Sequence, residues 1–179
     1  TLLRRSSAFS SAAARFSLNT GDGRCAGCEG QGLRTIEMSF LPDVKVPCDV
    51  CHGQRFNAET LAVSWRGRNI GEVLKMEVDE AVEFFASMQA IAHPLQLLKD
   101  VGLGYLTLDR QSRTLSGGEV QRINLTTALG TSLVNTLFVL DEPSIGLHPR
   151  DMGRVIEVMQ RLRDAGNSLV VVEHDPQGM

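Results

Sequence analysis

Apolar and polar positions in the C-terminal third follow the periods of a strand, a helix and a second strand. Residues 137–140 form a continuous apolar run, and a second apolar run, residues 169–172, follows Ser168. Between them, apolar residues recur at helical spacing over 149–165, and Gly166-Asn167 supply a stop signal. The pattern predicts two buried strands that flank an amphipathic helix.

The remainder of the chain carries shorter periodic segments. Residues 79–85 begin with an acid suited to cap a helix and continue with apolar residues at helical spacing. Pro94 suits the first turn of a following helix, which should end before Gly102. Further upstream, residues 35–40 and 44–46 are typical of two short strands joined by a tight turn. These elements together predict an α/β fold.

One predicted helix start has the features of an anion-binding turn. Ser116 is placed to cap the helix, and Glu119 three residues later completes a Ser-x-x-Glu capping box. Gly117 and Gly118 let the backbone approach a ligand closely, and the first N–H groups and the positive dipole end of the helix favour a negative charge. An ordinary turn and cap is the alternative interpretation.

Acidic and imidazole side chains follow both apolar runs of the C-terminal third. Asp141 and Glu142 come directly after the first run, and Glu173 and His174 come directly after the second. In open α/β sheets ligands bind at the carboxyl ends of the strands. We therefore expect this edge of the sheet to carry chemistry.

The four cysteines form two Cys-x-x-Cys pairs, Cys25 with Cys28 and Cys48 with Cys51, separated by 19 residues. This spacing is typical of a zinc site in which each pair forms a knuckle with two thiolates on one ion. A redox dithiol pair is one alternative. Cys48 to His52 also matches a haem-attachment string, but that interpretation requires export and leaves the first cysteine pair unexplained. We predict structural zinc, with His52 as a neighbour of the site.

Composition limits the classes of partner. The formal net charge is −3, so contact with DNA would need a local basic patch instead of an overall positive charge. Such a patch is plausible around the cysteine pairs, although solvated surface residues are the plainer interpretation. Its candidate members are four basic residues and one aromatic residue: Arg24, Arg34, Lys45, Arg55 and Phe40.

Length and the ends of the chain add two expectations. The 179 residues, of which 42% are hydrophobic, suffice for one or two cores, and no apolar run approaches the length of a membrane span. Residues 1–20 are rich in Arg, Ser and Ala and contain no acid, as transit peptides do. The chain begins without Met and stops after an expected strand, so we interpret it as a piece of a longer protein.

Two strings in the C-terminal third resemble an ABC-type ATPase. LSGGEVQR (115–122) is similar to the signature motif, and LFVLDEP (137–143) is similar to the Walker B strand. The resemblance implies that Asp141 holds Mg²⁺ through water, that Glu142 activates the attacking water, and that His174 senses the γ-phosphate. Residues implied to bind ATP are Ser116, Gly117, Gly118, Glu119, Gln121 and Asp141.

The cysteine region narrows the resemblance to one family. GRCAGCEGQG (23–32), EMSFLPDVKVPCDVCHGQRF (37–56) and NIGEVLKMEVDEAVEFF (69–85) are together similar to the UvrA family of DNA-repair ATPases. Members bind structural zinc, ATP and Mg²⁺ in the cytoplasm, recognise damaged double-stranded DNA, and load UvrB, with UvrC acting later. The resemblance also implies that each ATP site is completed by a second ATPase half or by a homodimer partner. It implies no contact with a membrane.

The resemblance also predicts a division of the chain and one missing part. The division is an incomplete N-terminal segment (1–24), a zinc hairpin (25–56), a helical signature-domain connector (57–112) and a partial ABC ATPase portion (113–179). The phosphate-cradling Gly-x-x-x-x-Gly-Lys-Ser/Thr loop does not occur, so we expect the chain alone to bind ATP weakly and to hydrolyse it negligibly.

Three alternatives remain open at this point. The hairpin resembles the second ATPase half of the family, whereas DEPSIGLHPRD (141–151) resembles the first half, so the half is not assigned. The protein is either the repair subunit or a UvrA-like ATPase outside repair, with a role in drug resistance or translocation. A zinc-stapled nucleic-acid-binding module without enzymatic activity is the third interpretation.

Overall fold

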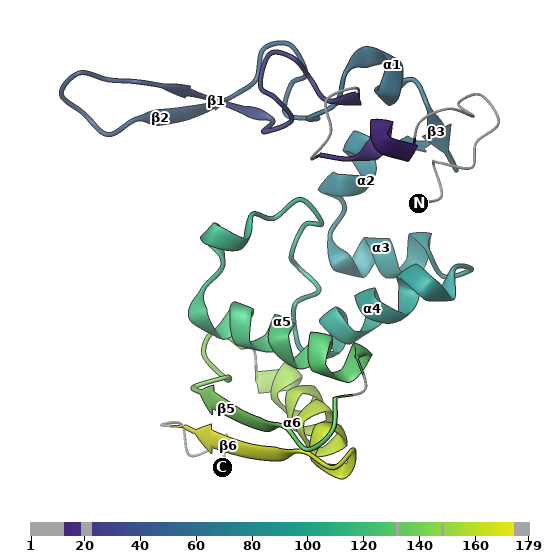
Figure 1. Ribbon diagram of the computed structural model, residues 1–179, viewed down its shortest axis with the longest axis vertical. Coiled ribbons are helices and arrows are strands. Elements are labelled where there is room, and N and C mark those ends of the chain that lie inside the picture. The colour runs from purple at the N-terminus through teal and green to yellow at the C-terminus, as the bar shows by residue number, and fades with distance from the viewer. Residues whose placement is uncertain (1–12, 19–22, 132, 148, 174–179) are drawn as a thin grey trace. The chain divides into compact units, whose positions relative to one another are not determined.

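The computed structural model describes residues 13–18, 23–131, 133–147 and 149–173, which divide into two compact units, Thr1–Lys75 and Met76–Met179. Both helices and strands are present, as predicted for an α/β protein (Figure 1). None of the described helices is both long and apolar enough to cross a membrane. The four-part division expected from the sequence stays a prediction.

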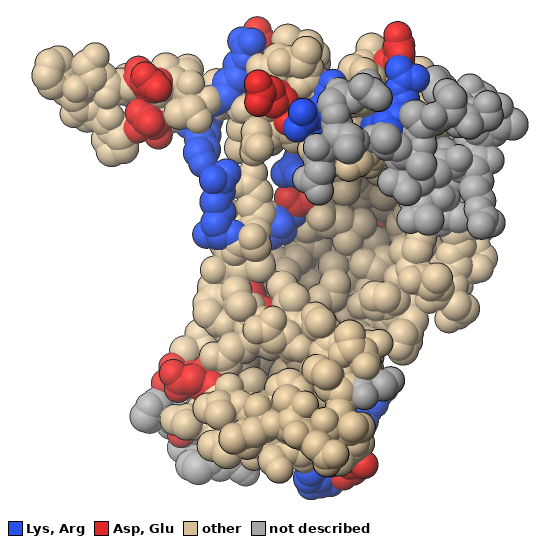
Figure 2. Space-filling view, in the orientation of Figure 1, with Lys and Arg blue, Asp and Glu red and all other residues tan. Residues whose placement is uncertain are grey.

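The N-terminal unit is built around a hairpin and a short helical segment. Its elements are η2 (Ala13–Phe16), β1 (Leu33–Ile36), β2 (Val44–Pro47), α1 (Ala58–Leu61), β3 (Ser64–Trp65), β4 (Arg68–Asn69) and α2 (Ile70–Lys75). Strands β1 and β2 pair antiparallel, with Leu33 opposite Pro47 and Ile36 opposite Val44. The hairpin extends away from the rest of this unit, and its outermost end carries no charge on the face drawn in Figure 2. Its apolar side chains are exposed, with Phe40 at 99%, so the hairpin has no core of its own.

Among its described residues, the C-terminal unit combines four α-helices and one short 3-10 helix with one pair of parallel strands. Its elements are α3 (Val78–Phe84), α4 (Gln89–Asp100), η4 (Ser112–Thr114), α5 (Gly117–Gly130), β5 (Leu137–Asp141), α6 (Pro149–Asp164) and β6 (Ser168–Val172). The predicted strand–helix–strand unit is confirmed, because α6 connects β5 to its parallel neighbour β6. Val155, Val158 and Leu162 form the buried face of α6.

Two details of the C-terminal unit differ from the expectations. Pro94 lies inside α4 and not in its first turn, because the helix begins at Gln89, five residues earlier. The strands were expected to be buried, but Leu140 is the only buried residue among those described in β5 and β6. Leu137 and Val139, whose side chains share one face because they alternate along the strand, are 62% and 65% exposed.

Candidate functional site

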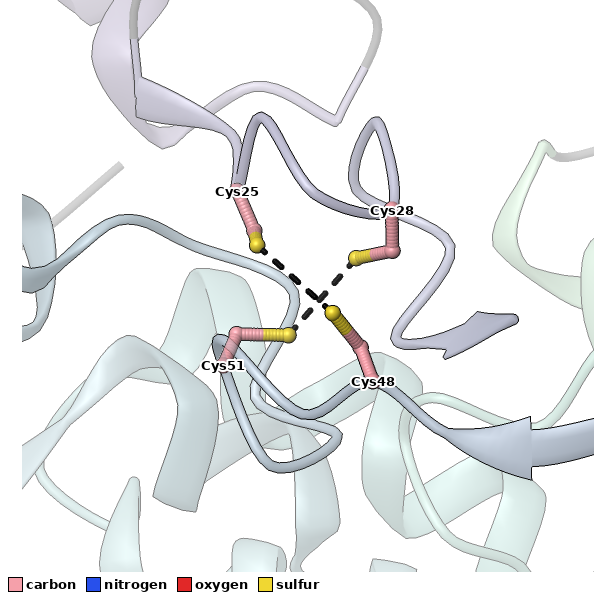
Figure 3. Close-up of side chains that lie close together, drawn as sticks. All are labelled: Cys25, Cys28, Cys48 and Cys51. Atoms are coloured by element: carbon pink, nitrogen blue, oxygen red, sulfur yellow. Dashed lines mark hydrogen bonds between the residues drawn. The ribbon is translucent and has the colours of Figure 1, made fainter.

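The four cysteine sulfurs converge on one point of the N-terminal unit (Figure 3). Cys25 Sγ lies 3.9 Å from Cys48 Sγ, Cys28 Sγ lies 3.6 Å from Cys51 Sγ, and all four sulfurs lie within 4.8 Å of one another. A tetrahedral zinc site with Zn–S bonds of about 2.3 Å requires S···S separations of about 3.8 Å. All four residues are buried, so their number, chemistry and spacing fit a zinc ion.

Backbone hydrogen bonds shape the two knuckles and tie them together. Gln31 N–H donates to Cys28 O at 2.8 Å, and Gln54 N–H donates to Cys51 O at 2.9 Å, which closes each knuckle into a turn. Cys48 N–H donates to Gly32 O at 2.9 Å across the site. Gly32 has φ +74°, and a Cβ there would lie 3.1 Å from the Gly53 carbonyl oxygen, so glycine is required where the knuckles meet.

The protein environment shifts the pKa values of the cysteine thiols in opposite directions. Burial raises the pKa of Cys28 to about 12 and also raises the pKa of Cys25. Backbone N–H groups of the second knuckle lower the pKa of Cys48 to about 7. Thiolate is the form that ligates a metal, so a bound cation would offset the burial that opposes ionisation of the first pair.

In the C-terminal unit, the predicted capping box is present at the start of α5. Glu119 N–H donates to Ser116 Oγ at 3.3 Å, and Ser116 N–H donates to Glu119 Oε2 at 2.7 Å. Ser116 and Gly117 are exposed, whereas Gly118 and Glu119 are buried. The first N–H groups of a helix have no partner within it. This turn therefore offers donors and a dipole to an anion from the solvent side.

The helix that follows also holds the end of β5. Gln121 Nε2 donates to Asp141 O at 2.8 Å, and Asp141 N–H donates to Gln121 Oε1 at 3.1 Å. One Nη of Arg122 donates to the carbonyl oxygens of Pro143 and Ile145, both at 3.0 Å. The structure thus brings the predicted turn and the predicted acids together within one unit.

The second acid of the pair, Glu142, has an unusual backbone conformation. Glu142 has φ 48°, in the left-handed region where non-glycine residues are uncommon and which recurs at functional sites. Its N–H donates to Val172 O at 2.8 Å. Just beyond it, Ser144 donates to Glu173 through its N–H at 3.0 Å and through Oγ at 2.7 Å. The residues at the end of β6 therefore also hold the loop after β5.

The roles of the candidate residues stay predictions, but their placement is described for all except one. His174 lies outside the described residues. Sequence reasoning missed Arg122 and Tyr105, and it placed Glu173 at the edge of the sheet without a specific role; the structure places all three in contact with the predicted site. For Arg122, the available signal was its position in the LSGGEVQR string. Nothing local in the sequence pointed to Tyr105.

Arg122 supports a stability prediction, because its side chain is 1% exposed and bonds two carbonyl groups. Arg122→Met should lower the free energy of unfolding by about 2–4 kcal/mol, since it leaves both carbonyls without their charged donor. Denaturant unfolding and hydrogen exchange of the amides of 141–147 measure this loss. Exposed Arg113 is the matched control, and Arg113→Met should cost below about 0.5 kcal/mol. Equal losses in the two variants would contradict the assignment.

Comparison with known proteins gives a consistent result. No protein-family model matches the chain. UvrABC system protein A of Streptococcus pyogenes serotype M1 is 52% identical over 162 residues, and that of Thermus thermophilus is 54% identical over 162 residues. Each alignment covers 90% of this chain and 17% of the relative, so the chain spans 17% of the length of these curated relatives.

A solved structure is similar over nearly the whole chain. The crystal structure of UvrA2 from Deinococcus radiodurans matches with a TM-score of 0.88 and 47% sequence identity. The match covers 99% of this chain and 22% of that one. The sequence identities, the structural match and the cysteine cluster agree, and the chain corresponds to a segment of the UvrA family.

Proposed function

We propose that this chain is the part of an ATP-dependent DNA damage-recognition subunit that carries one signature turn, one Walker B-type acid pair and one zinc hairpin. The observation that supports it most is the pairing of Gln121 with Asp141 at the end of β5 and of Arg122 with the loop that follows. That pairing joins the two ATPase-like motifs in space. The identity of more than half over 162 residues to UvrABC system protein A of Thermus thermophilus supports the repair role.

In this proposal each candidate residue has a distinct task. Asp141, exposed at the carboxyl end of β5, would hold Mg²⁺ through water. Glu142 would orient or deprotonate the attacking water, and His174 would sense the γ-phosphate. The turn at Ser116 and Gly117 would contact ATP bound to a second ATPase half, contributed by the remainder of the protein or by a second copy.

The proposed cofactor of the N-terminal unit is structural zinc on Cys25, Cys28, Cys48 and Cys51. The hairpin buries little apolar surface, so the ion would supply much of its folding free energy. Arg34 is not a free cation for DNA, because it donates to Gly27 O at 3.2 Å and pairs with Asp49 at 2.9 Å. We therefore propose contact with damaged DNA and with UvrB for the full-length protein. We do not assign this contact to the basic residues around the cysteine pairs.

Binding to lesion-bearing and undamaged duplexes tests the repair role. The full-length protein that carries this segment should bind a duplex with one bulky lesion at least about tenfold more tightly than the undamaged duplex. The slopes of log affinity against log salt should be similar for the two duplexes, since both offer the same phosphates. Fluorescence anisotropy over a salt titration measures both quantities.

A second candidate, which the sequence leaves open, is a UvrA-like ATPase outside excision repair. The same titration separates the two candidates. Equal affinity for the two duplexes, together with ATP turnover that lesions do not change, would reject the repair role and leave the second candidate.

A further inference from the structure

Glu119 is an acid within the first turn of the helix that is proposed to receive a phosphate. A carboxylate is favourable at this end of a helix, but a carboxylate turned toward a nucleotide would repel it at close range. In this chain the side chain is turned inward, with 8% exposure of the residue. Oε2 accepts from Ser116 N–H at 2.7 Å, and Oε1 accepts from the phenol of Tyr105 at 2.5 Å. Both oxygens therefore have donors within the unit.

Tyr105 reaches Glu119 from a loop that is itself held in place. The flanking residues Leu103 and Leu106 are 0% and 7% exposed. Asp79 N–H donates to Gly104 O at 3.0 Å, and a Cβ on Gly104 would lie 2.5 Å from the Asp79 carboxylate, so the backbone packs closely there. The phenol is thus presented to the carboxylate by a rigid segment, although the ring itself is half exposed.

The pKa shifts of Tyr105 and Glu119 agree with this geometry. The hydrogen bond from Tyr105, followed by the bond from the Ser116 backbone, holds the pKa of Glu119 below its ordinary value. Burial, followed by the hydrogen bond with Glu119, raises the pKa of Tyr105. At neutral pH the phenol is therefore the donor and the carboxylate is the acceptor.

We propose that Tyr105 is a positioning residue for the signature-like turn, because its phenol holds the Glu119 carboxylate away from the face where Ser116 and Gly117 would meet a nucleotide phosphate. The inference rests on the proposed nucleotide role of this turn. It assigns Glu119 to the shaping of the turn instead of to contact with ATP.

Tyr105→Phe in the full-length protein tests this inference, because it removes one hydroxyl and keeps the ring. The released carboxylate can then turn toward the phosphate, so the KM for ATP should rise about tenfold while kcat changes less than about threefold. Zinc content and thermal midpoint should stay close to those of the parent protein. Thr107→Val is the matched control, since it removes another hydroxyl-to-carboxylate bond of the same loop, from Thr107 to Asp109 at 2.7 Å, and should leave KM unchanged.

A second substitution separates repulsion from loss of structure. Gln retains the capping-box bond to the Ser116 N–H but carries no charge. Glu119→Gln alone should keep a KM within about threefold of the parent, and the Tyr105→Phe/Glu119→Gln double variant should recover the parental KM. A double variant as impaired as Tyr105→Phe, or an unchanged KM in Tyr105→Phe, would overturn the inference while the proposed function stands. Absence of ATP turnover in the parent protein would overturn both.

Discussion

Glu142→Gln in the full-length protein should lower ATP turnover by about 10²- to 10⁴-fold, the range that general-base catalysis contributes. Glutamine has nearly the same shape as glutamate but does not accept a proton from water at neutral pH. ATP binding should persist, because the turn at Ser116 and the acid at Asp141 are unchanged. Single-turnover phosphate release measures hydrolysis, and retention of labelled nucleotide on a filter measures binding.

The control for this variant is an exposed glutamate that lies outside the loop after β5. Glu157 is exposed on α6, and Glu157→Gln should leave turnover within about twofold of the parent. Turnover that survives in Glu142→Gln would reject the assignment of the base. It would also favour the interpretation of the chain as a zinc-containing binding module without catalysis.

Removal of the metal should unfold the cysteine cluster and its hairpin. Zinc binding contributes free energy on the order of 10 kcal/mol in small cysteine sites, and the exposed β1–β2 hairpin has no apolar core to replace it. A chelator, or Cys48→Ala, should therefore make the segment 25–56 sensitive to protease while residues beyond 76 stay protected. Elemental analysis of the purified protein should find one zinc ion per chain.

A substitution beside the ligands controls for local perturbation. Ala26 is exposed between the two ligands of the first knuckle, and Ala26→Ser should keep both the metal and the protease resistance. Stoichiometric disulfides in metal-free, folded protein would contradict the prediction and support the redox interpretation. Unchanged protease resistance after chelation would show that the hairpin folds without the ion.

Interactions between residues close in the sequence were predictable. Spacing alone placed the four cysteines at one site, because each knuckle closes over three residues and needs only a turn. The capping box at Ser116 and Glu119 was predictable for the same reason. The unit β5–α6–β6 followed from two continuous apolar runs on either side of a segment with apolar residues at helical spacing, a pattern that the chain carries locally.

Interactions across long sequence separations were decided by the tertiary structure. Whether Arg122 bonds Pro143 and Ile145, 21 and 23 residues away, depends on how α5 packs beside the loop after β5, and no periodicity encodes that. The same holds for Tyr105 and Glu119, 14 residues apart. Burial of the strands could not be inferred either, because an apolar run shows only that its side chains would be more stable when covered. Whether a covering element is present is decided only by packing between segments.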